Sequence, residues 1–266
     1  MNKIVYSLLA AAALTVSSCA GSYNIKGTSN VSMLDGKMLY LKAYSDSELK
    51  NLDSCDVVHG QFNFHGRLDS TKLVTLFMND EGMMPIVLEE GTVNVKIDNG
   101  LQKVSGTPLN DKLSDFIEKY NQLENLMNDL SHKQTQAIMN GEDEAVTNAR
   151  LAEEARSIAA KEDKLITSFI VENFDNVLGP GVFFMMTAGN TYPELAPWIE
   201  DIMSKATDSF KNDAYVKDYY EKAMQNQQIM NGMATPDAPA PHPAMQHPPM
   251  DGPTPNQLAQ PAEEQK

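Results

Sequence analysis

The chain contains two cysteines, so thiol chemistry is the first reactivity that its residues could support. Thiol–disulfide exchange needs an attacking thiol of low pKa and normally a second, resolving cysteine. No Cys-x-x-Cys pair occurs in the sequence, and Cys55 stands directly between Ser54 and Asp56. Because a neighbouring carboxylate raises the pKa of a thiol, the Cys55 thiol should be unreactive. We therefore expect Cys55 to be a half-buried strand residue. A mixed disulfide between Cys55 and a partner protein is the alternative that would give this thiol a function.

Histidine, methionine and acidic side chains offer further candidates for metal or acid–base chemistry. His59 and His65 are six residues apart, but His59 falls in a predicted turn, so the two rings need not share a face of a strand. Glu89 and Glu90 are adjacent and would point to opposite faces of a strand, which argues against a carboxylate pair. We expect the histidines to be turn and strand-rim residues. Copper capture by the C-terminal segment is an alternative, because soft ligands occur there between prolines at no fixed spacing: Met233, His242, Met245, His247 and Met250.

Common catalytic signatures are missing from the sequence. It has no Gly-rich phosphate loop, no nucleophile elbow and no His-Glu-x-x-His motif. The formal net charge is −15, which disfavours nucleic acid because phosphate binding needs clustered Lys and Arg. Two cysteines cannot build a disulfide-stapled scaffold or a four-thiolate zinc site. We therefore expect a non-enzymatic protein that uses no cofactor, no metal and no nucleic acid.

The N-terminus has the features of a processing signal. Lys3 precedes an apolar run, Ile4–Val16, whose thirteen residues are too few to cross a hydrocarbon core of about 30 Å. Val16-Ser17-Ser18-Cys19 resembles the lipobox of bacterial lipoproteins. This resemblance implies that residues 1–18 are a signal peptide and that Cys19 receives a diacylglycerol and becomes the first residue. An ordinary secretory signal cut near Ala20 is the alternative.

Lipidation at Cys19 would anchor the protein stably, because several acyl chains such as palmitate hold a protein on a membrane whereas one is marginal. No other hydrophobic run approaches eighteen residues, so we expect a protein that is anchored but does not span the membrane. The residues after Cys19 include no acidic cluster of the kind that resembles a surface-export signal. We therefore expect an envelope lipoprotein of the cell outer membrane that faces the periplasm.

Residues 19–107 have the pattern of a β-rich domain. Short apolar or alternating runs are separated by turns rich in Gly, Asp and Asn, which favours a small antiparallel sandwich or barrel. Phe62 and Phe64 alternate with polar neighbours and should share one face. The predicted strands are Met38–Leu41, Cys55–Val58, Gln61–His65, Val74–Met78, Pro85–Leu88 and Thr92–Ile97.

Residues 108–231 have a helical period, so the fold class is α+β. The first predicted helix runs from Pro108 to Asn140, and its apolar residues follow heptad spacing: Leu109, Leu113, Phe116, Tyr120, Leu123, Met127 and Leu130. A second helix over residues 143–173 should pack against it as an antiparallel hairpin. The stretch Thr191–Glu194 resembles a capping box that opens a third helix, and a fourth is predicted over residues 213–230. The stretch Gly179–Gly181 should break the chain before a short apolar run.

Residues 232–266 form a tail of different composition. They hold nine of the fourteen prolines of the chain and no aromatic residue. Such a segment cannot bury enough surface to offset the entropy of ordering it, so we expect it to be disordered with a polyproline II bias.

Three motifs in the β-rich region resemble a known family. The stretches Leu52–Gly66, Pro85–Gly91 and Val104–Asp111 resemble, in the right order, the segments "DS…v.nGkF.F.G", "ip..lE.G" and "v.GtplNd" of the DUF4369 domain of Bacteroidetes lipoproteins. In many members this domain is followed by helices and then by a thioredoxin-like domain. Here the tail begins where that domain would start, so the family's redox chemistry can be assigned to no residue of this chain.

These observations predict a lipid-anchored, periplasm-facing binding or scaffold protein without catalytic residues. Its partners would be the membrane, through the lipid on Cys19, and an envelope protein or glycan. The alternative is an accessory protein to separate thioredoxin-like thiol–disulfide oxidoreductases, with Cys55 as its thiol or the β-rich domain as its docking surface.

Overall fold

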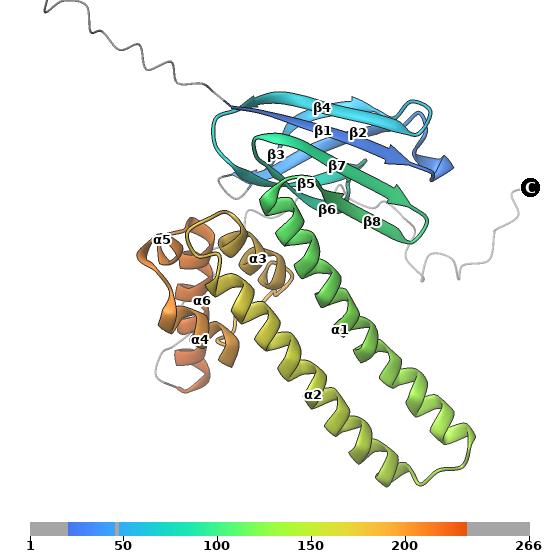
Figure 1. Ribbon diagram of the computed structural model, residues 1–266. Helices are drawn as coiled ribbons and strands as arrows, with labels where there is room; N and C mark the ends of the chain where they lie inside the picture. Colours follow the sequence, from blue (N-terminus) through green and yellow to red (C-terminus); the bar gives the residue numbers. More distant parts are fainter. Residues whose placement is uncertain (1–20, 46–47, 233–266) are drawn as a thin grey trace, which may run out of the picture.

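The computed structural model describes residues 21–45 and 48–232, which form a β-sandwich followed by six helices (Figure 1). The sequence-based predictions for the signal peptide, for Cys19 and for the tail from residue 233 onward lie outside the described residues. The α+β class, with a sandwich first and helices after it, is confirmed.

Eight strands form two four-stranded sheets, with strand orders β4-β1-β7-β8 and β3-β2-β5-β6. We call the second one sheet B. Inward-facing side chains alternate with polar outward ones along the strands, as in Val93, Val95 and Ile97. The strands are β1 Gly21–Ser29, β2 Met38–Ser45, β3 Glu48–Asp56, β4 Gln61–Leu68, β5 Lys72–Met78, β6 Glu81–Leu88, β7 Gly91–Asp98 and β8 Leu101–Ser105.

The sandwich departs from the predicted strands in several ways, and two of its strands, β1 and β8, were not among those predicted. The pairing is not wholly antiparallel, because β1 runs parallel to β7. The strand β3 begins at Glu48 and ends at Asp56, so Val57 and Val58 lie after it and not within it. Its first five residues are all exposed, which left no apolar alternation to detect. A single 3-10 turn, η1 Ser32–Leu34, also interrupts a region in which no helix was predicted.

The first two helices form the predicted antiparallel hairpin. The helix α1 spans Pro108–Met139 and α2 spans Glu144–Val171, and Asp143 caps α2 by accepting a hydrogen bond from the Val146 amide. At 1.5 Å per residue the 32 residues of α1 extend about 48 Å. The seven heptad positions predicted from the sequence are all buried or half-buried, which explains why the stripe was readable.

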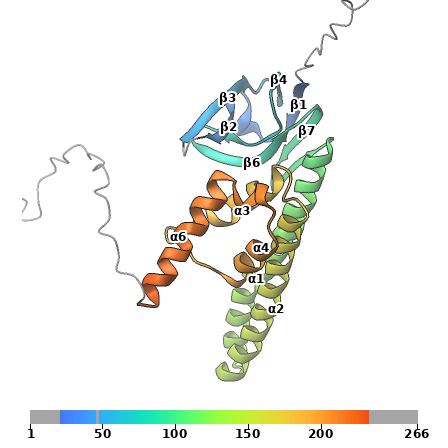
Figure 2. The ribbon, with the colours of Figure 1, turned by 90° about the vertical axis from the view of Figure 1, so that its left-hand side faces the viewer.

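The remaining helices pack as a compact group against the outer face of sheet B, as the two views show (Figures 1 and 2). Their apolar core includes Val87 of β6 and is joined by Leu73 of β5, so it continues directly onto the sheet. The helices are α3 Leu178–Thr187, α4 Pro197–Lys205, α5 Asp208–Lys211 and α6 Ala214–Met230.

Two predictions in this region were wrong. The stretch Gly179–Gly181 does not break the chain but lies in the first turn of α3, where Pro180 has no intrahelical N–H bond to lose. The third long helix does not open at residue 191, because α4 begins only at Pro197. The backbone before it is non-helical and is bonded to α6: the Asn226 side chain donates to the Pro193 carbonyl and the Tyr219 hydroxyl to that of Glu194.

Candidate functional site

The contact between the sandwich and α1 is built largely from two of the three motif segments, Pro85–Gly91 and Val104–Asp111, and is closed by hydrogen bonds. We call the residues Val87, Glu89, Gly106, Thr107, Asn110, Asp111 and Ser114 the α1 joint. The Asn110 side chain is 1% exposed; its oxygen accepts from the Val87 amide at 2.9 Å, and its nitrogen donates to the Val87 carbonyl at 2.8 Å. Asn110 thereby pairs with the open side of β6, the edge strand of sheet B, as a neighbouring strand would.

The other polar groups of the α1 joint also serve the fold. One carboxylate oxygen of Glu89 accepts from the amides of Leu109 and Asn110 at 2.9 and 3.1 Å, and so caps the N-terminus of α1. Gly106 has a φ of +104°, and a Cβ there would lie 2.7 Å from the Thr92 carbonyl oxygen. The motif residues therefore position α1 on the sandwich, and their hydrogen bonds leave little capacity for a ligand.

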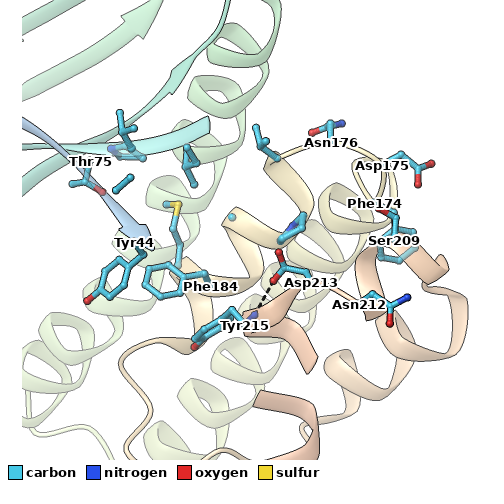
Figure 3. Close-up of a pocket in the computed structure, with 18 of the residues that line it drawn as sticks. Tyr44, Thr75, Phe174, Asp175, Asn176, Phe184, Ser209, Asn212, Asp213 and Tyr215 are labelled. Carbon is cyan, nitrogen blue, oxygen red and sulfur yellow. Dashed lines mark hydrogen bonds between the residues drawn. The ribbon is translucent and has the colours of Figure 1, made fainter. Parts of the chain in front are cut away.

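A cavity of about 540 Å³ lies on the other side of β6, between the outer face of sheet B and the helices (Figure 3). We call it the groove. Its floor comes from β2, β5 and β6, and its walls come from the α2–α3 connection, from α3, from α5, from the start of α6 and from the segment that joins these two helices. Its lining includes Lys42, Tyr44, Leu73, Thr75, Pro85, Asp175, Asn176, Gly181, Phe184, Ser209, Asn212, Asp213 and Tyr215.

Three aromatic rings from separate elements form a row along the groove. The Tyr44 ring of β2 lies 4.8 Å from the Phe184 ring of α3, and Phe184 lies 4.8 Å from the Tyr215 ring of α6, centroid to centroid (Figure 3). Tyr44 is 60% exposed, so one end of this row faces solvent. We call Tyr44, Phe184 and Tyr215 the aromatic row. Rings that are held by the fold but remain accessible can bind ligands at low entropic cost.

The row is fixed by hydrogen bonds behind it. The Thr187 hydroxyl donates to the Phe183 carbonyl at 2.7 Å, so its oxygen is left to accept from the Tyr215 hydroxyl at 3.0 Å. Burial raises the pKa of Tyr215, which therefore stays a neutral donor at physiological pH. Tyr215 thus presents its ring to the groove while its polar end is used by the protein.

Most acidic and amide groups of the groove wall are also engaged. Asp213 caps α6 by accepting from the Tyr215 and Val216 amides at 3.0 and 3.1 Å (Figure 3). Asp175 accepts from the Thr207 hydroxyl at 3.2 Å, and the Asn176 oxygen accepts from the Leu178 amide at 2.9 Å. The exposed side chains of Ser209 and Asn212 lie on this wall.

The floor of the groove continues onto a cationic and aromatic platform. The Lys42 ammonium lies 4.7 Å from the centre of the Phe77 ring and 5.6 Å from that of Tyr40, and 3.9 Å from an Asp80 carboxylate oxygen. Its side chain is only 18% exposed, so its alkyl stem is packed on the sheet. Lys42 therefore places one well-positioned positive charge at the groove.

A close approach of α3 to the sheet sets the shape of the groove. A Cβ on Gly181 would lie 2.5 Å from Cδ2 of Leu73, so only glycine lets the helix lie this near to β5 without displacing that side chain. Gly181 of the Gly-Pro-Gly stretch therefore has a role in packing α3 on the sheet, and it does not act as the predicted chain break.

The candidate residues from the sequence lie away from the groove. Cys55 is half-buried in β3, and burial raises the pKa of its thiol to about 11, with Asp53 and Asp56 adding to the effect and the Asn63 amide opposing it. His59 occupies a turn at φ +52°, and His65 is exposed on β4. Within residues 21–45 and 48–232, no three His, Cys, Asp or Glu side chains are placed to hold a metal ion.

The groove itself was missed from the sequence. Tyr44, Phe184 and Tyr215 are far apart in the chain and come together only through the packing of α3 and α6 on sheet B. No local pattern marks such a site. The available signal was Tyr44, a large aromatic residue three residues beyond the predicted strand Met38–Leu41.

Comparison with known proteins identifies the sandwich but not the helices. Residues 23–113 match the family model described as a domain of unknown function, DUF4369. The match covers the sandwich and the start of α1, whereas most of the groove wall lies beyond it. No curated protein and no solved structure matched the chain. The resemblance seen in the three motifs is thus confirmed, and the protein contains a DUF4369 domain.

Proposed function

We propose that this protein is a lipid-anchored, periplasm-facing lipoprotein that binds a ligand or partner in the groove and does not catalyse a reaction. The observation that carries the proposal is the open aromatic row at the junction of the sandwich and the helices. Ligand sites are mostly apolar concave surfaces with a few fixed polar groups, and the groove has this composition.

The polar groups of the groove support binding over chemistry. Asp175 and Asp213 accept hydrogen bonds from the protein itself, which holds them as structural acceptors. Lys42 is held over two rings by its alkyl stem and its cation–π contacts. These groups can orient a ligand, whereas general acid–base catalysis would need a group that is free to exchange a proton with it.

Anchoring through Cys19 fits the position of β1. This strand begins at Gly21, two residues after Cys19, so the lipid would hold the sandwich within about 7 Å of chain from the membrane surface. In both ribbon views β1 and β4 lie on the side of the sandwich opposite the helices (Figures 1 and 2). The groove and the hairpin would then face away from the membrane. None of the helices in the described ranges is long and apolar enough to cross a bilayer.

Binding in the groove is tested by quantitative capture from the native envelope. Full-length protein with Tyr44→Ala should lose a specific co-purifying partner about tenfold or more relative to the unmodified protein, because ring contacts dominate such sites. Tyr192→Ala is the matched control, since Tyr192 is also exposed, at 73%, and does not line the groove. Equal recovery with both variants would remove the groove from the proposal.

The anchor has its own test. A radioactive fatty acid supplied to the cells should label the unmodified protein and should not label a Cys19→Ala variant. The unmodified protein should also sediment with membranes. An unlabelled product, or release of the unmodified protein into osmotic-shock fluid, would contradict the anchor and would leave the binding test unaffected.

A further inference from the structure

We propose that the groove is a polyproline-binding site and that its resident occupant is a segment of the same chain, residues 236–243. This inference rests on the proposed role of the groove as a binding site and names what fills it. We call Pro236-Asp237-Ala238-Pro239-Ala240-Pro241-His242-Pro243 the proline segment.

The chemistry of the groove suits proline. Extended proline-rich peptides dock on aromatic-lined grooves, because their rings pack on aromatic faces and their φ angles are already restricted, which lowers the entropic cost of binding. The aromatic row offers three such rings at successive spacings of 4.8 Å, and Tyr44 is open to solvent. The proline segment carries four prolines in eight residues and one acidic side chain.

The path of the chain brings the segment within reach. The helix α6 has Tyr215 at its start, in the groove, and runs away from it over 17 residues, or about 25 Å (Figure 2). A polyproline chain advances about 3.1 Å per residue, so about eight residues suffice to return. Pro241 and Pro243 stand 9 and 11 residues beyond Gly232, the last described residue, so both can reach Tyr215, whereas Pro236 and Pro239 would lie along the approach to it.

Tethering makes even a weak contact effective. A short flexible connection gives the tethered segment an effective concentration on the order of 1 mM. If the free segment binds with a Kd of about 0.1 mM, the tethered one would occupy the groove about nine-tenths of the time and would weaken binding of a competitor about tenfold. An external partner would then have to displace the proline segment, which ties the tail to the proposed binding role.

The test uses full-length chains throughout and a fluorescent peptide of residues 234–250, with binding followed by anisotropy. In the tail variant, Pro236→Ala, Pro239→Ala, Pro241→Ala and Pro243→Ala vacate the groove. We expect this variant to bind the peptide saturably below about 1 mM and the unmodified chain to bind it about tenfold more weakly. The matched control replaces four later prolines instead: Pro248→Ala, Pro249→Ala, Pro253→Ala and Pro255→Ala. It should behave like the unmodified chain.

A second pair of variants locates the site. Adding Tyr44→Ala to the tail variant should abolish peptide binding, whereas adding Tyr192→Ala should leave it unchanged. Overlapping circular dichroism spectra and cooperative unfolding transitions would show that both chains are folded.

Several results would overturn the proposal. They are no saturable binding by the tail variant, equal binding by the unmodified chain, or binding that survives Tyr44→Ala. A dimer of the unmodified chain that dissociates in the tail variant, seen by sedimentation, would mean that the tail fills the groove of a second copy. Failure here together with a Tyr44-dependent partner in envelope capture would reject the proline segment as occupant and keep the binding function.

Discussion

The α1 joint and the groove lie on opposite sides of the same edge strand, β6, but they use their polar groups differently. At the joint, the Asn110 side chain forms hydrogen bonds with both the N–H and the C=O of Val87, and these groups are no longer available to a ligand. At the groove, Pro85 of the same strand lines an open cavity in which aromatic rings stay accessible. Two of the three motifs that resemble the DUF4369 domain, Pro85–Gly91 and Val104–Asp111, meet at the joint. They therefore mark how the domain attaches its first helix, whereas the proposed binding surface depends on helices beyond the family match.

The largest expected effect comes from breaking the joint. Asn110→Ala would leave the buried N–H and C=O of Val87 without partners, so the free energy of unfolding should fall by about 3 kcal/mol. Urea unfolding measures the change. Asn121→Ala on the exposed side of the same helix is the control and should change stability by about 0.5 kcal/mol or less. If both variants are equally stable, the joint does not hold the two parts together.

The reactivity of Cys55 tests whether β3, which carries this thiol, is a functional site in place of the groove. With its pKa raised from 9.0 to about 11 by burial, the thiolate fraction at pH 8 should be about a hundredfold below that of an ordinary thiol. Alkylation by iodoacetamide in the folded protein should therefore be slow and should rise about tenfold per pH unit up to pH 10. Rapid alkylation at pH 7 would favour the redox-accessory alternative, and so would mixed-disulfide adducts that disappear in Cys55→Ser.

The same shift has a consequence for stability. Below pH 9 the thiol is protonated in both the folded and the unfolded chain, so Cys55 adds no pH dependence. Between about pH 9 and 11 the unfolded chain loses the proton while the folded chain keeps it. The contribution of Cys55 to the free energy of unfolding should therefore fall as the pH rises through this window. A Cys55→Ala variant should lack this component in unfolding measurements at pH 8 and 10.

A smaller effect is expected where α3 meets the sheet. Gly181→Ala gains helix propensity but forces Leu73 or α3 to move, so we expect a net loss of about 1–2 kcal/mol in the free energy of unfolding. Gly189→Ala is the control, because no atom lies within 4 Å of its added Cβ. The loss should shrink in a chain that also carries Leu73→Ala. An unchanged stability would mean that the close approach does not shape the groove.

The smallest effect on stability is expected in the groove itself. Tyr44→Ala removes a largely exposed ring and one ring contact, so the free energy of unfolding should fall by about 0.5–1 kcal/mol. Its effect on binding should be the largest of any variant named here. Thermal unfolding beside envelope capture would show this separation, and a loss of stability as large as that of Asn110→Ala would erase the distinction between the two regions.

The sequence predicted what local patterns encode and missed what distant packing creates. The α1–α2 hairpin was readable because its heptad residues are buried in register, and Asp143 marked the start of α2. The strand β3 was placed too late because its first five residues are all exposed and show no apolar alternation. The start of α4 was misplaced because side chains of α6, distant in the sequence, bond the carbonyls of residues 193 and 194. The groove was not predicted at all, since its three rings come from β2, α3 and α6.

The central claim is that the groove, rather than the joint or Cys55, is the binding surface. It is tested most directly by photo-crosslinking in intact cells, with p-benzoylphenylalanine in place of Tyr44 and, as the control, in place of Tyr192. We expect discrete products only from position 44, either an internal link to residues 233–266 or an adduct with an envelope partner. No product from position 44, or the same products from position 192, would contradict the account.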